Sequence, residues 1–271
     1  MRPLIDTVLT TGMLAVVPAG LRLLRVPHRL LRAWWLGAVP GALSLWLERG
    51  PWAAGAASAY ALATVCLAVQ APIRLRTRPS PSPREIAALT ALVTPAIAAV
   101  ALVAERAGYP LWGFSLTILS LTVAHFHFAG FAAALVAGLT SRAAGDGPLS
   151  RAAALSVPGG TLLVLGGYFA GDWAELAGAV VLTAGMWLVG WLTLAEVRRG
   201  GHDRITGALL TFSSLVLAVS MVLALSWALG EATGLPRPPL DWMIATHGLL
   251  NAFGFAVCAI AAWLRLRPRP L

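Results

Sequence analysis

Two histidines in the middle of an apolar run are the residues of this chain best placed to do chemistry. His125 and His127 belong to the segment AHFHFAG at 124–130, and residues 112–139 contain no Asp, Glu, Lys or Arg. Such a run predicts a membrane-spanning helix, where ionisable side chains are costly to bury and by default mark a functional site. Imidazole moves protons near neutral pH and also ligates metals and haem.

Helical geometry separates these two histidines. Residues i and i+2 lie roughly 200° apart around an α-helix, so His125 and His127 point to different faces. We therefore expect one of them to line a cavity and the other to hydrogen-bond across a helix contact. A π-bulge, or flexibility at Gly130, is the alternative that would bring both to one site.

A third histidine lies in the last apolar run. His247 and Asn251 are four residues apart in HGLLNAFGF, so they share a helix face, and we expect them to meet His125 or His127 in one cavity in the outer half of the membrane. Glu105 and Asp6, near outer span ends, are further proton-carrying candidates. The predicted catalytic residues are His125, His127, His247, Asn251, Glu105 and Asp6.

These residues must be positioned by membrane-spanning helices, because the composition leaves no room for a sizeable soluble domain. Of the 271 residues, 58% are hydrophobic and 11% are charged, and the mean hydropathy is +0.78. The prediction is a single all-α transmembrane domain over residues 1–271, with the N-terminal run as its first span rather than a cleaved signal. The nine predicted spans are 5–23, 33–48, 52–73, 85–105, 112–139, 151–170, 174–195, 205–229 and 241–263. The range 33–48 is short and interrupted by Pro40, so a tilted or re-entrant segment is the alternative there.

The basic residues predict the orientation. All 20 are arginines, and the nine spans place 16 of them on one side and leave Arg2, Arg49, Arg106 and Arg237 on the other. Positive loops mark the cytoplasmic side, so we expect the N-terminus outside and the C-terminus inside a bacterial plasma membrane. The same reasoning assigns the net charge of +9 to topology rather than to nucleic acid. Seven acidic residues collect at the outer ends and suggest either solvated helix ends or an acidic mouth: Asp6, Glu48, Glu105, Asp172, Glu175, Glu231 and Asp241.

Cofactor sites are not indicated by the remaining residues. Cys66 and Cys258 each lie alone inside an apolar run, and neither forms a C-x-x-C pair. We therefore expect no resident cofactor or metal. The expected partners are the lipid bilayer and a lipophilic small-molecule substrate, while the sequence does not set an oligomeric state.

The two histidine segments resemble the YndJ-like family of bacterial membrane proteins. That family carries a similar H-F-H-[FY]-A-G-F segment, matched here at 125–131, and a later H-G-x-x-N-[AG]-x-G-F segment, matched at 247–255. The resemblance implies a multi-pass membrane protein and the same histidine site. The family is sometimes labelled as transporters, which leaves the reaction open.

Three function classes fit these residues. The first, narrowly favoured, is a membrane enzyme that isomerises, cyclises or hydrates a lipophilic molecule by proton transfer. The second is a secondary transporter that uses the histidines as a proton relay, although the chain has no inverted repeat and nine spans do not halve. The third is a metal- or haem-binding protein.

Overall fold

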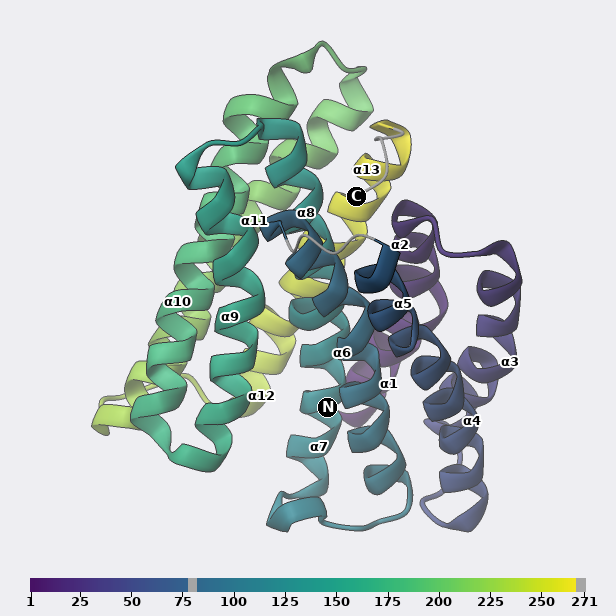
Figure 1. The fold of residues 1–271 in the computed structure, drawn as a ribbon. Helices are drawn as coiled ribbons and strands as arrows, with labels where there is room; N and C mark the ends of the chain where they lie inside the picture. Colours follow the sequence, from purple (N-terminus) through teal and green to yellow (C-terminus); the bar gives the residue numbers. More distant parts are fainter. Residues whose placement is uncertain (78–81, 267–271) are drawn as a thin grey trace. The chain divides into compact units, whose positions relative to one another are not determined.

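The structure is helical throughout the residues that it describes. It is a computed structural model that describes residues 1–77 and 82–266, and it contains no β-strand within those two ranges (Figure 1). Cα packing divides the described chain into two compact units. The first holds residues 1–77 and 89–132, and the second holds residues 82–88 and 133–266. The single domain expected over residues 1–271 stays a prediction.

Eight of the nine predicted spans are helical stretches long and apolar enough to cross a membrane. Each agrees with its predicted range to within a few residues. The fold is therefore that of an all-α, multi-pass membrane protein. The eight stretches are Arg2–Leu24, Pro51–Thr77, Pro83–Arg106, Leu116–Ala144, Pro148–Ala170, Asp172–Gly200, Arg204–Thr233 and Leu240–Leu266.

Six complete α-helices and most of a seventh, α6, build the first unit. Helix α6 belongs to this unit from Leu89 onward. The helices are α1 (Arg2–Thr11), α2 (Val17–Leu24), α3 (His28–Ser44), α4 (Pro51–Ala68), α5 (Gln70–Thr77), α6 (Pro83–Arg106) and α7 (Leu116–His125), with a short 3₁₀ turn η2 (Leu111–Gly113).

Helix α3 corresponds to the remaining predicted span, 33–48, but begins and ends earlier, with Pro40 inside its 17 residues. Arg2, at the start of the first span, donates to Glu105 Oε1 over 2.9 Å. The neighbouring Arg106 donates to the Ser44 carbonyl at the end of α3 over 3.1 Å. The start of the first span and the end of α3 thus lie at one face of the unit. Helix α3 retraces the first span instead of turning back inside it, which supports its assignment as a ninth crossing.

Wide π-helical turns interrupt several spans. In these turns each N–H bonds five residues back, and such turns occur frequently at functional sites. Two of them contain predicted histidines, and a third contains Asn251. The π-helical segments are η1 (Gly12–Val16), η3 (Phe126–Ala132), η4 (Thr193–Val197), η6 (Ile244–Gly248) and η7 (Leu250–Val257).

The second unit contains the remaining helices, and two of them pack closely through glycines. Helices α9 and α10 lie side by side (Figure 1). A Cβ on Gly160 would lie 2.5 Å from the Leu182 backbone nitrogen, and one on Gly178 would lie 2.5 Å from the Val164 nitrogen. Small residues allow this approach between membrane helices. The helices are α8 (Ala133–Ala144), α9 (Pro148–Ala170), α10 (Asp172–Leu192), α11 (Arg204–Thr233), α12 (Leu240–Met243) and α13 (Cys258–Leu266), with a 3₁₀ turn η5 (Arg198–Gly200).

Replacing Gly160 by alanine is expected to destabilise the protein by about 1–3 kcal/mol, because the added methyl group overlaps the α10 backbone. Gly159 is the matched control, since a Cβ there meets nothing within 4 Å. Gly159→Ala should be neutral or slightly stabilising, because alanine favours the helix. Thermal unfolding of both variants in detergent measures the difference. Equal unfolding temperatures would contradict the close packing.

Side-chain caps fix two helix starts. Ser82 Oγ, directly before the start of α6 at Pro83, accepts from the Glu85 N–H over 3.3 Å. Asp203 accepts from the N–H groups of Ile205 and Thr206 at the start of α11. Hydrogen bonds from Thr206, together with the guanidinium of Arg265, hold the pKa of Asp203 well below its usual range.

Candidate functional site

A tyrosine and a histidine form a buried hydrogen-bonded pair inside the first unit. Tyr60 Oη, from the middle of α4, lies 2.5 Å from Nε2 of His127 in η3. Both side chains have no exposed surface. Their rings are nearly parallel, with centroids 5.8 Å apart and planes 21° apart. His127 is thus the member of the predicted pair that bonds to a neighbouring helix.

The partners of the imidazole fix its tautomer. Nδ1 of His127 lies 2.7 Å from the Val123 carbonyl oxygen, which can only accept, so Nδ1 carries a proton. In the neutral ring Nε2 is then an acceptor, and the Tyr60 hydroxyl donates to it. A backbone carbonyl on the far nitrogen also stabilises the imidazolium that forms if Nε2 takes a proton.

Two glycines allow the helices to approach closely enough for this bond. A Cβ on Gly12 would lie 3.2 Å from the His127 Cβ, and one on Gly41 would lie 2.6 Å from the Tyr60 Cβ. Any larger residue at Gly41 would push α3 away from α4. The contact between tyrosine and histidine therefore depends on small residues in the first span and in α3.

Trp34 supports Tyr60 from the other side. Its ring meets the tyrosine edge-on, with centroids 5.4 Å apart, and its Nε1 donates to the Met13 carbonyl over 3.1 Å. In the π-helical pattern of η1 that carbonyl would accept from residue 18, which is a proline without an N–H. Trp34 is itself buried, where its indole N–H satisfies the carbonyl that Pro18 leaves open.

His125 ends α7 immediately before the π-helical segment. Its side chain is half-buried, and its ring meets Phe126 edge-on with centroids 5.5 Å apart. A π-bulge at this position was one of the two sequence-based alternatives, and η3 provides it. Of the two histidines, His127 is the one that makes the described hydrogen bond to Tyr60.

His247 and Asn251 form a separate hydrogen-bonded ring in the second unit. Nδ1 of His247 donates to the Ser220 carbonyl over 2.8 Å, and Nε2 accepts from Asn251 Nδ2 over 3.0 Å. The Ser220 hydroxyl closes the ring by donating to Asn251 Oδ1 over 3.0 Å. The shared helix face predicted for His247 and Asn251 is confirmed. The cavity expected to join them to His125 or His127 stays a prediction.

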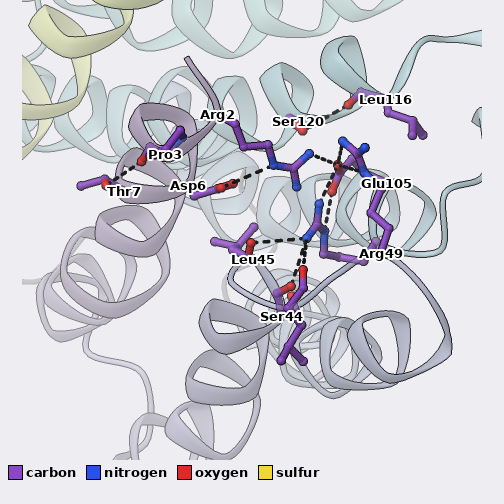
Figure 2. Close-up of polar contacts among 12 residues, drawn as sticks. Arg2, Pro3, Asp6, Thr7, Ser44, Leu45, Arg49, Glu105, Leu116 and Ser120 are labelled. Atoms are coloured by element: carbon purple, nitrogen blue, oxygen red, sulfur yellow. Dashed lines mark hydrogen bonds and ion pairs between the residues drawn. The ribbon is translucent and has the colours of Figure 1, made fainter.

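Glu105 anchors a buried ion-pair cluster at the face where α1 begins (Figure 2). Its carboxylate, 1% exposed, accepts from Arg2 over 2.9 Å and from Arg49 over 2.8 Å. Arg106 binds both carboxylate oxygens, at 2.5 and 2.7 Å. Asp6 pairs with Arg2 at 3.4 Å. Every one of these contacts to Glu105 comes from an arginine, so the contacts favour a structural role for Glu105.

The ion pairs of these acidic residues can be compared with the acidic mouth predicted from the sequence. In the first unit, Asp6 and Glu105 face arginines rather than an open cavity. In the second unit, Glu231 is paired with Arg237, whose guanidinium also lies 4.6 Å from the centre of the Trp227 ring. Acidic side chains in these positions are neutralised by arginines, which weighs against an open acidic mouth.

Sequence reasoning missed the partners of the histidine and of Glu105. The chain has three tyrosines, and Tyr60 lies in the middle of an apolar span, which is the signal that could have identified it. Arg106 follows Glu105 directly at a span end, and such an adjacent pair could have indicated an ion-pair site. Arg2 and Arg49 are separated from Glu105 in sequence, so nothing local connects them to it.

Within the described residues, no group of three or more His, Cys, Asp or Glu side chains could hold a metal ion. The YndJ-like protein family matches residues 7–255. The chain belongs to this family. The matched region includes both histidine segments, Tyr60 and Glu105. The match therefore confirms the resemblance to the YndJ-like family that was inferred from residues 125–131 and 247–255. No curated protein and no solved structure matches this YndJ-like chain.

Proposed function

We propose that this YndJ-like protein is an integral membrane enzyme that performs proton-transfer chemistry on a lipophilic small molecule. The observation that carries the proposal is the buried hydrogen bond between Tyr60 Oη and His127 Nε2. An acid and a base with matched donor and acceptor atoms, held by two helices in a water-poor interior, suit general acid–base catalysis.

The proposed proton-transfer step follows from the tautomer of His127, in which Nδ1 carries the proton and Nε2 accepts from Tyr60. Tyr60 takes a proton from one carbon or oxygen of the substrate as its own phenolic proton moves to His127 Nε2. The positive imidazolium is stabilised by the Val123 carbonyl on Nδ1. Reversal of both transfers returns a proton to another atom of the substrate. Protons balance, so the product is an isomer or a cyclised form, and hydration requires one added water.

Eight apolar helical stretches, with α3 assigned as a ninth crossing, and the arginine distribution support the location that we propose for it. We place it in the bacterial plasma membrane with the N-terminus outside and the C-terminus in the cytoplasm. The four arginines on the outer side do not argue against this, because Arg2, Arg49 and Arg106 pair with Glu105 and Arg237 pairs with Glu231. Activity of a cytoplasmic reporter fused to the C-terminus checks the orientation.

The test uses a bacterial strain that lacks the gene, complemented with the wild-type chain or with variants. Lipid extracts of cells and medium are compared by mass spectrometry. The wild-type chain should convert a lipophilic precursor into a product of equal mass, or one heavier by a single water. Tyr60→Phe should reduce this conversion by roughly 10²–10⁴-fold, because the phenolic proton is lost. Tyr109→Phe is the matched control, since Tyr109 is exposed.

The outcome separates the enzyme from the other two functions. A transporter would leave the set of compounds unchanged and alter only their distribution between cells and medium. A haem protein would show visible absorbance after purification. Full activity of both the Tyr60→Phe and the His127→Phe variants would contradict the proposed catalytic role of this pair. Asn251→Ala in the same strain tests whether the hydrogen-bonded ring with His247 and Ser220 contributes.

A further inference from the structure

The ion-pair cluster around Glu105 has a second feature besides burial, which is an excess of positive charge at its exposed edge. We propose that Arg2 and Arg49 bind the phosphate group of an anionic lipid headgroup at the face of the first unit where α1 begins. This inference goes beyond the proposed enzyme and does not depend on it.

The charges of the cluster do not balance. Arg2, Arg49 and Arg106 contribute three positive charges, whereas Asp6 and Glu105 contribute two negative charges. Three arginines also share one oxygen, Glu105 Oε1. One further anion would neutralise the cluster and give its guanidinium groups additional acceptors.

The surplus positive charge of the cluster lies on Arg2 and Arg49 rather than on Arg106. Arg106 is 1% exposed, and all three of its nitrogens are bonded, Nε and Nη2 to Glu105 and Nη1 to carbonyls at the end of α3. The side chains of Arg2 and Arg49 are 37% and 40% exposed. Among the described contacts, Arg2 Nη2 and Arg49 Nη1 make no hydrogen bond. Two guanidinium groups that converge on one carboxylate also present adjacent N–H donors to solvent.

Aromatic side chains place this edge at the level of lipid headgroups. Trp46 lies on the connection between α3 and α4, which also carries Arg49, and Trp52 lies in the first turn of α4; they are 58% and 88% exposed. Tyr109 and Trp112, on the connection between α6 and α7 that follows Arg106, are also exposed. Tryptophan and tyrosine gather where the acyl chains meet the headgroups. A phosphate at that depth belongs to a phospholipid.

The chemistry of the two arginines selects phosphate. Guanidinium groups present planar pairs of N–H donors that match two phosphate oxygens and are less strongly hydrated than an ammonium. The headgroup must carry a net negative charge, because the cationic group of a zwitterionic headgroup would be repelled by the surplus charge. Phosphatidylglycerol is a suitable probe.

The experiment maps lipid contacts directly on the full chain. The purified protein in mixed micelles is irradiated with photoactivatable phosphatidylglycerol, or with diacylglycerol carrying the same photoactivatable chain, and the labelled peptides are identified by mass spectrometry. Segments 44–52 and 105–113 should be labelled more strongly by phosphatidylglycerol. The double variant Arg2→Gln/Arg49→Gln should reduce that labelling roughly tenfold, because both charge-assisted bonds are lost. Labelling of the arginine-rich segment 198–204 should not change, which provides the internal control.

A second variant covers the case in which the glutamine variant does not fold. Arg2→Lys/Arg49→Lys keeps the charges that face Glu105 but loses the planar donor pairs, so labelling should fall a few-fold. Equal labelling by the neutral lipid, or unchanged labelling in both double variants, would overturn the site. Loss of labelling when millimolar inorganic phosphate is added would overturn the lipid as its source and assign the site to a soluble phosphate compound.

Discussion

Replacing Glu105 by alanine is expected to destabilise the first unit by about 3–5 kcal/mol, because it leaves the buried guanidinium of Arg106 without its counter-charge. Arg106 binds both oxygens of Glu105 and is 1% exposed, so water cannot replace the lost carboxylate. Chemical unfolding of the purified chain in detergent measures the loss.

Glu48 provides the matched control for this variant. It is an exposed acidic residue that precedes Arg49 in the connection between α3 and α4. Glu48→Ala should change stability by less than about 0.5 kcal/mol, as exposed substitutions usually do. Glu105→Gln, which keeps an acceptor oxygen but loses the charge, should fall between the two. If the alanine variants at 48 and 105 unfold alike, Glu105 does not anchor the cluster.

The bond between Tyr60 and His127 is expected to appear as a coupling energy. Tyr60→Phe leaves Nε2 buried without a donor and should cost about 1–3 kcal/mol. His127→Phe leaves the tyrosine hydroxyl without its acceptor and removes one of the hydrogen bonds to the Val123 carbonyl, so its cost should be at the upper end of that range or above it. The double variant should cost less than the sum of the two, with an interaction energy of about 0.5–3 kcal/mol.

The double-mutant cycle is measured by unfolding the wild type, Tyr60→Phe, His127→Phe and the double variant in the same detergent. Gly41→Ala is expected to weaken the same bond, since its methyl group would overlap the Tyr60 Cβ. Strict additivity of the two phenylalanine substitutions would show that the hydrogen bond contributes nothing to stability.

The spans could be predicted from sequence because their signal is local. Apolar runs of sufficient length identify the helices, and arginines at their ends mark the connections. Helix α3 was placed least well, because Trp34, Trp35 and Pro40 obscure where its apolar part begins. Its end contacts Arg106, which is 62 residues away from Ser44 in sequence.

The candidate site could be predicted only in part. His127 stood out because an imidazole in an apolar run is costly to bury, and His247 and Asn251 stood out because their spacing puts them on one face. The partner of His127 is Tyr60, 67 positions earlier, and only the packing of α4 against η3 reveals it. The role predicted for Glu105 took account of its acidity alone, whereas its environment is set by arginines from two distant segments.

Arg106 also affects the order in which the chain can complete its structure. The carbonyls of Ser44, Leu45 and Leu47, at the end of α3, accept from its Nη1. Helix ends need such partners, and a cation there also offsets the negative end of the helix dipole. During synthesis α3 leaves the ribosome well before residue 106 has been added. The end of this short, proline-containing helix therefore gains its hydrogen-bond partner only after α6 has been synthesised and has packed beside it.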